Sequence, residues 1–259
     1  METVSLTSGR TYLLARPSVG RPPWPLVLML HGTGGSAAFA ADETRLVPFA
    51  AEAGFVIAFA DGLPVNPAEP PRFLSNPQRW NDGSTAPGDP FHVDTDDVGY
   101  LTEVIADAVA RAECDTARVY LTGFSNGAAM AFRFAAERSD LLAAVAPIAG
   151  YCPASVPVPA RPVPTLFLLG EADLLIPVAG GPVRLPWGNR TVVRPPIRDT
   201  ITRWESRLGT PFEVVTVPGL GHHWPGGKGQ FNTRIGGPTS DGLDANREIW
   251  AFFRRHRLE

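Results

Sequence analysis

The five residues at positions 123–127 have the pattern of an activated nucleophile. They read Gly-Phe-Ser-Asn-Gly, so a glycine stands two positions before Ser125 and another two positions after it. An apolar segment, Arg118–Thr122, precedes them and an alanine-rich run follows. Between a strand and a helix this pattern forms a sharp, strained turn that lifts the serine oxygen above the sheet. The pattern therefore predicts Ser125 as a nucleophile rather than as a residue that only caps the following helix.

Two adjacent histidines follow the last predicted strand. A serine hydroxyl is a weak nucleophile, so a base must lie within hydrogen-bond reach of it. After the apolar segment Phe212–Val217 the chain reads Pro-Gly-Leu-Gly-His-His-Trp-Pro, which places His222 and His223 in a glycine-rich loop. Neighbouring side chains diverge, so only one of them can face the serine. We expect His222 to be the base and keep His223 as the alternative.

An acidic residue is expected between the nucleophile and the base, just after a buried strand. The segment Thr165–Leu169 is such a strand, and Gly-Glu-Ala-Asp follows it. We expect Asp173 to accept a hydrogen bond from the imidazole and to stabilise its protonated form. Glu171 is the alternative.

A third glycine-rich loop follows the buried run Pro25–Leu30 and reads His-Gly-Thr-Gly-Gly. Attack on a carbonyl creates an oxyanion that needs at least two N–H donors. We expect these donors to be the backbone amides of Asn126 and Thr33, with Gly34 as the alternative to Thr33. The loop lacks the glycine and lysine spacing of nucleotide-binding loops, and no His or Cys spacing indicates a metal. The predicted chemistry needs no cofactor.

The elements that must hold these residues alternate between strand and helix. Strands are expected at Val4–Leu6, Arg10–Ala15, Pro25–Leu30, Phe55–Ala60, Arg118–Thr122, Leu142–Ile148, Pro164–Leu169 and Phe212–Val217. Helices are expected at Ala40–Ala53, Thr95–Glu113, Asn126–Arg138, Ile197–Leu208 and Leu243–Arg254. Near-continuous apolar strands between helices are typical of a mostly parallel, doubly wound sheet flanked by helices. Together with the serine turn and the chain order serine, acid, histidine, this sheet predicts the α/β-hydrolase fold. We expect one catalytic domain over residues 1–257, with no large separate lid, and residues 258–259 as a cloning remnant outside the fold.

Two long segments carry no periodic pattern. Residues 62–94 are rich in Pro, Asn, Asp and Gly, and their aromatic residues favour an ordered loop over the site. The proline-rich stretch 176–196 is expected to be an inserted loop. Asp96 and Asp97 are expected to cap the helix that follows them.

Composition excludes several classes of partner. The 259 residues are 44% hydrophobic with a formal net charge of −3, so nucleic acid and anionic membrane surfaces are not expected as partners. The longest apolar run is too short to span a membrane. The two cysteines, Cys114 and Cys152, should lie at opposite ends of neighbouring strands, so we expect two free thiols. A monomer is expected.

Six segments together resemble the family of polyhydroxybutyrate-depolymerase-like and feruloyl-esterase-like proteins, which is related to carbohydrate esterase family 1. They are HGTGGS at 31–36, RWNDG at 79–83, DDVGYL at 96–101, RVYLTGFSNGAAMAFRFAAE at 118–137, VAPIAG at 145–150 and GHHWPGG at 221–227. The resemblance implies a serine esterase, secreted or at the cell surface, that acts on feruloyl or acetyl groups of plant polysaccharide or on polyesters. It also implies that Ser125, Asp173 and His222 match the family's triad positions and that Trp80 and Trp224 line the substrate cleft.

The chain departs from the family's pattern at two places. Its acid segment reads LLGEADLLIP, where relatives more often have His-Gly before the aspartate and proline after it, and the doubled histidine is less usual. The segment that contains Trp80 is also compatible with a packing cluster under the loop. A serine peptidase of the same fold, a protein that only binds a ligand, and a cytoplasmic location remain the alternatives.

Overall fold

The computed structural model describes residues 1–85, 87–208 and 212–259. Within them the main sheet has eight strands in the order β1-β2-β4-β3-β7-β8-β9-β12. These strands are β1 (Glu2–Ser5), β2 (Thr11–Ala15), β3 (Trp24–Leu30), β4 (Val56–Ala60), β7 (Cys114–Phe124), β8 (Ala144–Ile148), β9 (Thr165–Gly170) and β12 (Phe212–Val217). β1 and β2 form an antiparallel edge, and β4 to β12 in that order are parallel. The expected mostly parallel sheet is confirmed.

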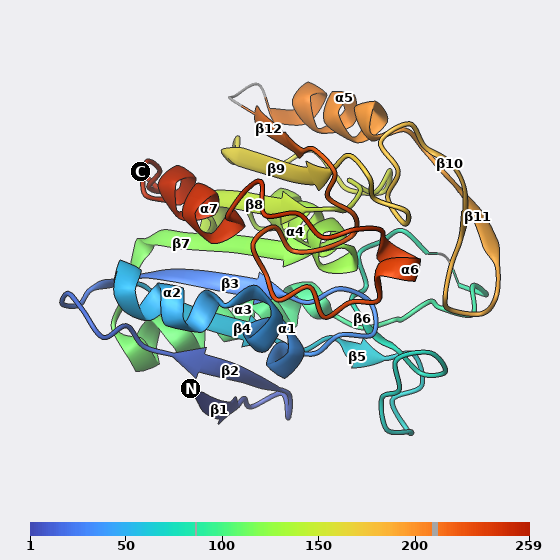
Figure 1. Cartoon of the computed structure of the whole chain (residues 1–259). Coiled ribbons are helices and arrows are strands. Elements are labelled where there is room, and N and C mark those ends of the chain that lie inside the picture. The colour runs from blue at the N-terminus through green and yellow to red at the C-terminus, as the bar shows by residue number, and fades with distance from the viewer. Residues whose placement is uncertain (86, 209–211) are drawn as a thin grey trace.

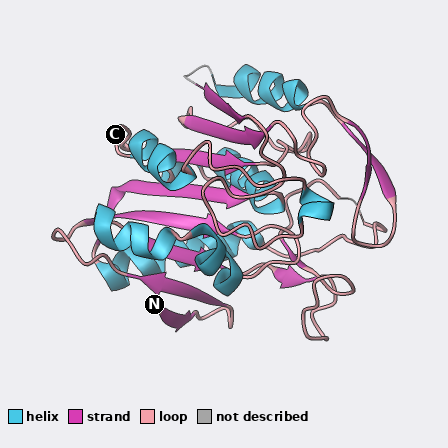
Figure 2. Cartoon of the chain, viewed as in Figure 1, coloured by secondary structure: helices cyan, strands magenta, loops and turns pink. Residues whose placement is uncertain are grey.

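Helices cover both faces of this sheet (Figures 1 and 2). They are α1 (Ala37–Thr44), α2 (Leu46–Ala53), α3 (Asp97–Ala112), α4 (Asn126–Glu137), α5 (Ile197–Leu208), α6 (Thr233–Gly236) and α7 (Ala245–Phe253), with a 3-10 turn, η1, at Ser139–Leu141. A hydrophobic core lies on each face of the sheet. Successive side chains of a strand point to opposite faces, so the residues of β3 contribute alternately to one core and to the other. Leu26, Leu28 and Leu30 pack in the core beneath α3, α4 and α5, whereas Val27 and Met29 pack beneath α1, α2 and α7.

The first helical segment is broken, contrary to the single helix expected over Ala40–Ala53. Helix α1 ends at Thr44 and α2 begins at Leu46, with Arg45 between them in the left-handed conformation at φ 55°. Pro48 explains the break, since it has no N–H with which to bond the carbonyl of Thr44. That carbonyl accepts a hydrogen bond from the Asn246 side chain instead, at 2.8 Å.

The two long irregular segments contain short antiparallel pairs. β5 (Leu63–Pro64) pairs with β6 (Gln78–Arg79) in the first of them. β10 (Gly181–Arg184) pairs with β11 (Thr191–Arg194) in the second, so the expectation of an inserted loop there is wrong in detail. Figure 1 shows the β10–β11 hairpin reaching from the top of the sheet down to the loop that carries β5 and β6.

Three smaller expectations concern the cysteines, the chain end and membranes. Cys114 and Cys152 are both buried and free, as expected. Leu258 belongs to the fold rather than outside it, because its amide donates to the Ala117 carbonyl at 2.9 Å and its side chain packs against the core. Of the helices that the structure describes, none is long and apolar enough to cross a membrane.

Candidate active site

Ser125 lies at the junction of β7 and α4 in a strained conformation, with φ 57° and ψ −116°. The flanking glycines permit this turn. A Cβ atom on Gly123 would lie 2.3 Å from the Gly127 carbonyl oxygen, and one on Gly127 would lie 2.4 Å from that of Leu30. The Ser125 amide donates to the Ile148 carbonyl at 2.9 Å, which fixes the turn against β8. Such a strained non-glycine residue is typical of a functional position.

The loops after β9 and β12 bring Asp173 and His222 together. His222 Nδ1 lies 2.7 Å from Asp173 Oδ2, and the two residues are 3% and 4% exposed. The other carboxylate oxygen, Oδ1, accepts the amides of Leu175 and Ile176 at 2.8 and 2.7 Å. These two amides fix the carboxylate, so Asp173 holds the imidazole with Nδ1 as donor and leaves Nε2 as the acceptor.

Neither alternative residue takes up this arrangement. The side chain of Glu171 is exposed. His223 is buried, and its Nε2 lies 2.9 Å from the Gly237 carbonyl oxygen. Because a carbonyl can only accept, His223 Nε2 is the protonated nitrogen and is already engaged.

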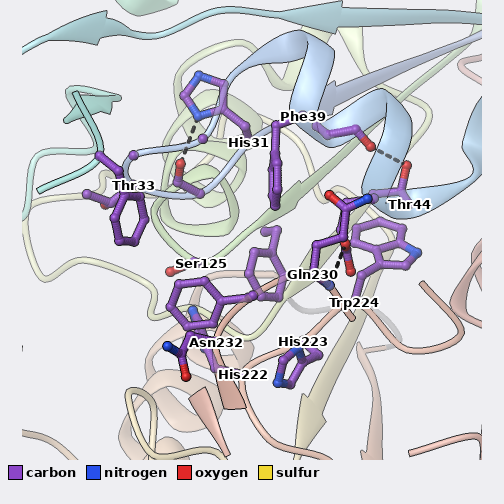
Figure 3. Close-up of a pocket in the computed structure, with 18 of the residues that line it drawn as sticks. His31, Thr33, Phe39, Thr44, Ser125, His222, His223, Trp224, Gln230 and Asn232 are labelled. Carbon is purple, nitrogen blue, oxygen red and sulfur yellow. Dashed lines mark hydrogen bonds between the residues drawn. The ribbon is translucent and has the colours of Figure 1, made fainter. Parts of the chain in front are cut away.

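Ser125 and His222 both line a cavity of about 430 Å³ at the carboxyl end of the sheet. Figure 3 shows His222 and His223 on one side of this cavity and the loop after β3 with α1 on the other. Over the described residues there is no direct hydrogen bond between the serine hydroxyl and the His222 ring. In the absence of substrate such bonds are often long and tighten when it binds.

The loop after β3 lies against the nucleophile. A Cβ atom on Gly32 would be 3.1 Å from that of Ser125. The Gly34 amide donates to the Gln78 carbonyl at 2.7 Å and the Gly35 amide to the Gly32 carbonyl at 3.0 Å, so neither is available to a ligand. Thr33, which lines the cavity, donates its amide to no backbone carbonyl among the described residues. Asn126 is the first residue of α4, where an amide has no partner within the helix.

Trp80 lies beneath the site rather than in the cavity wall. It is fully buried, and its Nε1 donates to the His31 carbonyl at 2.9 Å. Its amide donates to the Asn126 side chain at 2.7 Å, and the same side chain donates to Asp82 at 2.6 Å. Trp80 is therefore not among the residues that line the cavity, where the resemblance implied it, and its segment forms a packing cluster under the loop.

His31, the first residue of the loop after β3, fixes that loop. Its Nδ1 donates to the Gly32 carbonyl at 2.8 Å, and its Nε2 accepts the Gly62 amide at 2.9 Å. Both bonds require one neutral tautomer. Burial lowers the pKa of His31, which keeps the ring neutral. Its position directly after a buried strand, next to glycines, was the available signal.

Most of the cavity wall is apolar or aromatic. Trp224 lines it, as implied by the resemblance, and is held by a hydrogen bond from Nε1 to the Asn246 side chain at 3.0 Å. The other aromatic residues of the wall are Phe39, Phe73, Phe124, Trp187 and Phe231. The carboxylate of Glu43 also lines the cavity but accepts the amides of Gly229 and Gln230, so it fastens the loop after His223 to α1.

Comparison with known proteins identifies the family. The model of the family described as esterase PHB depolymerase matches residues 10–155, more than half of the chain. The chain belongs to this family. Its similarity to esterase NocK of Nocardia uniformis subsp. tsuyamanensis is 31% identity over 83% of the chain and 70% of that protein. Feruloyl esterase B of Piromyces equi is 30% identical over 61% of the chain, which spans only 27% of that protein's length.

The fold is that of known esterases. A thermostable esterase of known structure superposes on 99% of the chain and 62% of its own, with a TM-score of 0.63 and 16% identity. The family and the names of the relatives support esterase activity.

Proposed function

We propose that the chain is a serine hydrolase of carboxylic esters that uses Ser125, His222 and Asp173 as its catalytic triad. The observation that carries the proposal is the 2.7 Å hydrogen bond between buried His222 and Asp173, in a cavity that also contains the strained serine. The same cavity contains the loop of Thr33, whose amide is not used by a backbone carbonyl of the described chain.

In this proposal the reaction has two steps. His222 Nε2 removes the Ser125 proton as the serine oxygen attacks the ester carbonyl, and Asp173 stabilises the imidazolium. The amides of Thr33 and Asn126 hold the oxyanion. The intermediate collapses when its bond to the alcohol oxygen breaks and His222 returns the proton to that alcohol. Water, activated by His222 in the same way, then releases the acid and restores the serine.

The cavity wall supports an apolar or aromatic acyl group as the substrate class. About 430 Å³ with aromatic walls accommodates a feruloyl group, an acetyl group or a short hydroxyalkanoate chain. We propose feruloyl or acetyl esters of plant polysaccharide, or short polyester esters, as substrates. Since such polymers lie outside cells, secretion or display at the cell surface is part of this proposal.

Hydrolysis of a substrate panel tests the proposal. The panel contains p-nitrophenyl acetate and butyrate, methyl ferulate, acetylated xylan and a soluble hydroxybutyrate oligomer. We expect Ser125→Ala and His222→Ala to lose about 10³-fold or more in kcat/KM, and His223→Ala to lose far less. If the wild type cleaves none of these esters, or if His223→Ala is as inactive as His222→Ala, the proposal is wrong.

A further inference from the structure

The cavity beside Ser125 extends from the surface into one of the two cores. Phe39 and Phe73 line it and are 40% and 39% exposed, so they mark its mouth. Four other lining residues are only 1% to 3% exposed, and we call them the inner end of the cavity: Met29, Ala40, Thr44 and Trp224. All of these except Thr44 belong to the hydrophobic core beneath α1, α2 and α7.

The inner end lies away from the nucleophile and is held by hydrogen bonds. Figure 3 shows Ser125 on one side of the view and Thr44 with Trp224 on the opposite side. Asn246 of α7 joins these last two residues, because its side chain donates to the Thr44 carbonyl at 2.8 Å and accepts from Trp224 Nε1 at 3.0 Å. These bonds fix α1 and the loop after β12 to α7, so the inner end is formed before a substrate binds.

The inner end offers a ligand an apolar surface. Its polar side-chain atoms are already used within the protein, since the Thr44 hydroxyl donates to the Ala40 carbonyl at 2.7 Å and Trp224 Nε1 donates to Asn246. A cavity with apolar walls takes up apolar groups. A feruloyl ring would place its hydroxyl group against atoms that are already hydrogen-bonded, whereas a hydrocarbon chain needs no such partner.

The acyl part of the ester is the part that fits a closed end. In the proposed mechanism the alcohol leaves before water attacks the acyl-enzyme, and an alcohol held at the inner end would have to pass the acylated Ser125. The acyl group stays bound to the serine, so it can fill the inner end through both steps.

We propose that the inner end of the cavity binds the hydrocarbon chain of an unbranched acyl group. The preferred esters then carry aliphatic acyl chains longer than butyryl, and the alcohol part lies towards the mouth. This inference rests on the proposed esterase function and narrows its substrate class.

Two series of esters test which part of the substrate enters the inner end. One contains p-nitrophenyl esters with acyl chains of two to ten carbons, and the other contains acetates of alcohols of two to ten carbons. We expect kcat/KM to rise about fourfold for each methylene group that the inner end buries, and to reach its maximum beyond four carbons in the acyl series alone.

The possible outcomes separate this inference from the proposed function. A maximum at two to four acyl carbons, or a rise with the length of the alcohol instead, overturns the inference while the esterase function stands. If no ester of either series is hydrolysed, the proposed function is wrong and the inference falls with it.

Two leucine variants locate the chain in the cavity. Ala40→Leu fills the inner end, so the ratio of kcat/KM for the octanoyl ester to that for the acetyl ester should fall by at least about tenfold. Ala38→Leu, the same substitution at an exposed position of α1, is the matched control and keeps the wild-type ratio. A ratio within one enzyme does not depend on the fraction of active protein. An unchanged ratio in Ala40→Leu overturns the inference.

The structure of a covalent adduct gives a second test that needs no variant. Ethyl p-nitrophenyl octylphosphonate is the probe, and a bond forms between Ser125 Oγ and phosphorus as p-nitrophenolate leaves and His222 takes the serine proton. We expect the octyl chain to lie against Ala40 and Trp224. An octyl chain at the mouth of the cavity, with the inner end unoccupied, contradicts the inference even though Ser125 has reacted.

Discussion

Asp173→Asn is the substitution whose effect the geometry specifies most closely. The carboxylate uses Oδ1 to accept two backbone amides and Oδ2 to accept the His222 Nδ1 proton. In the variant, the amide oxygen must keep the two backbone donors, which turns the NH₂ group towards His222. Nδ1 can then only accept, so the ring proton moves to Nε2 and His222 no longer accepts the serine proton. We expect kcat to fall by about 10⁴-fold, the size found for this change in other serine triads.

The assay is p-nitrophenyl acetate hydrolysis with the initial rate followed at pH 7 to 9. Because the effect depends on the tautomer, KM should change little while kcat falls. Glu171→Gln is the matched control, since it removes the alternative acid and should keep wild-type activity. Activity of Asp173→Asn within tenfold of wild type, or a large loss in Glu171→Gln, refutes the reasoning.

Three further perturbations test the surroundings of the triad. Trp80→Phe removes the hydrogen bond to the His31 carbonyl. We expect the free energy of unfolding, measured in urea, to fall by about 1–3 kcal/mol. We also expect kcat, measured by ester hydrolysis, to fall by at least about tenfold. Phe231→Ala enlarges the cavity beside His222 and should shift the kcat/KM ratio towards longer acyl chains by about tenfold, measured with p-nitrophenyl esters of two to eight carbons. Burial lowers the pKa of His31 in the folded state from its ordinary value of 6.5. The neutral ring therefore contributes fully to the free energy of unfolding above pH 6.5. This contribution is lost as the pH falls from 6.5 towards the folded-state pKa, with a slope of up to about 1.4 kcal/mol per pH unit. His31→Gln should flatten the dependence of the free energy of unfolding on pH, measured by urea titrations between pH 7 and 5. If the variant keeps the wild-type slope, groups other than His31 cause the pH dependence.

The sequence was informative about the sheet and the order of the site residues because these depend on local patterns. Apolar runs mark strands buried on both faces, and the carboxyl ends of parallel strands meet at one edge. The serine turn, the aspartate and the histidine each follow such a run, so their convergence could be predicted without coordinates. The helix break at Arg45 was missed, although Pro48 in the sequence was its signal.

The supporting contacts could not be predicted because they join distant segments. The Asn126 side chain bonds Trp80 and Asp82, more than 40 positions earlier, and nothing in the local pattern shows this pairing. The resemblance implied that Trp80 lines the cleft, and the local sequence does not show its contacts with the His31 carbonyl and the Asn126 side chain. The β10–β11 hairpin was missed because its strands are short and lie among prolines.

Covalent labelling of the nucleophile tests the central claim most directly. The chain is treated with diisopropyl fluorophosphate, and intact-mass and peptide analysis locate the adduct. We expect one adduct per chain, on Ser125, with complete loss of esterase activity, and no adduct in Ser125→Ala. Continued ester hydrolysis with Ser125 unmodified, or an adduct at another residue that accounts for the loss, would contradict the proposed mechanism.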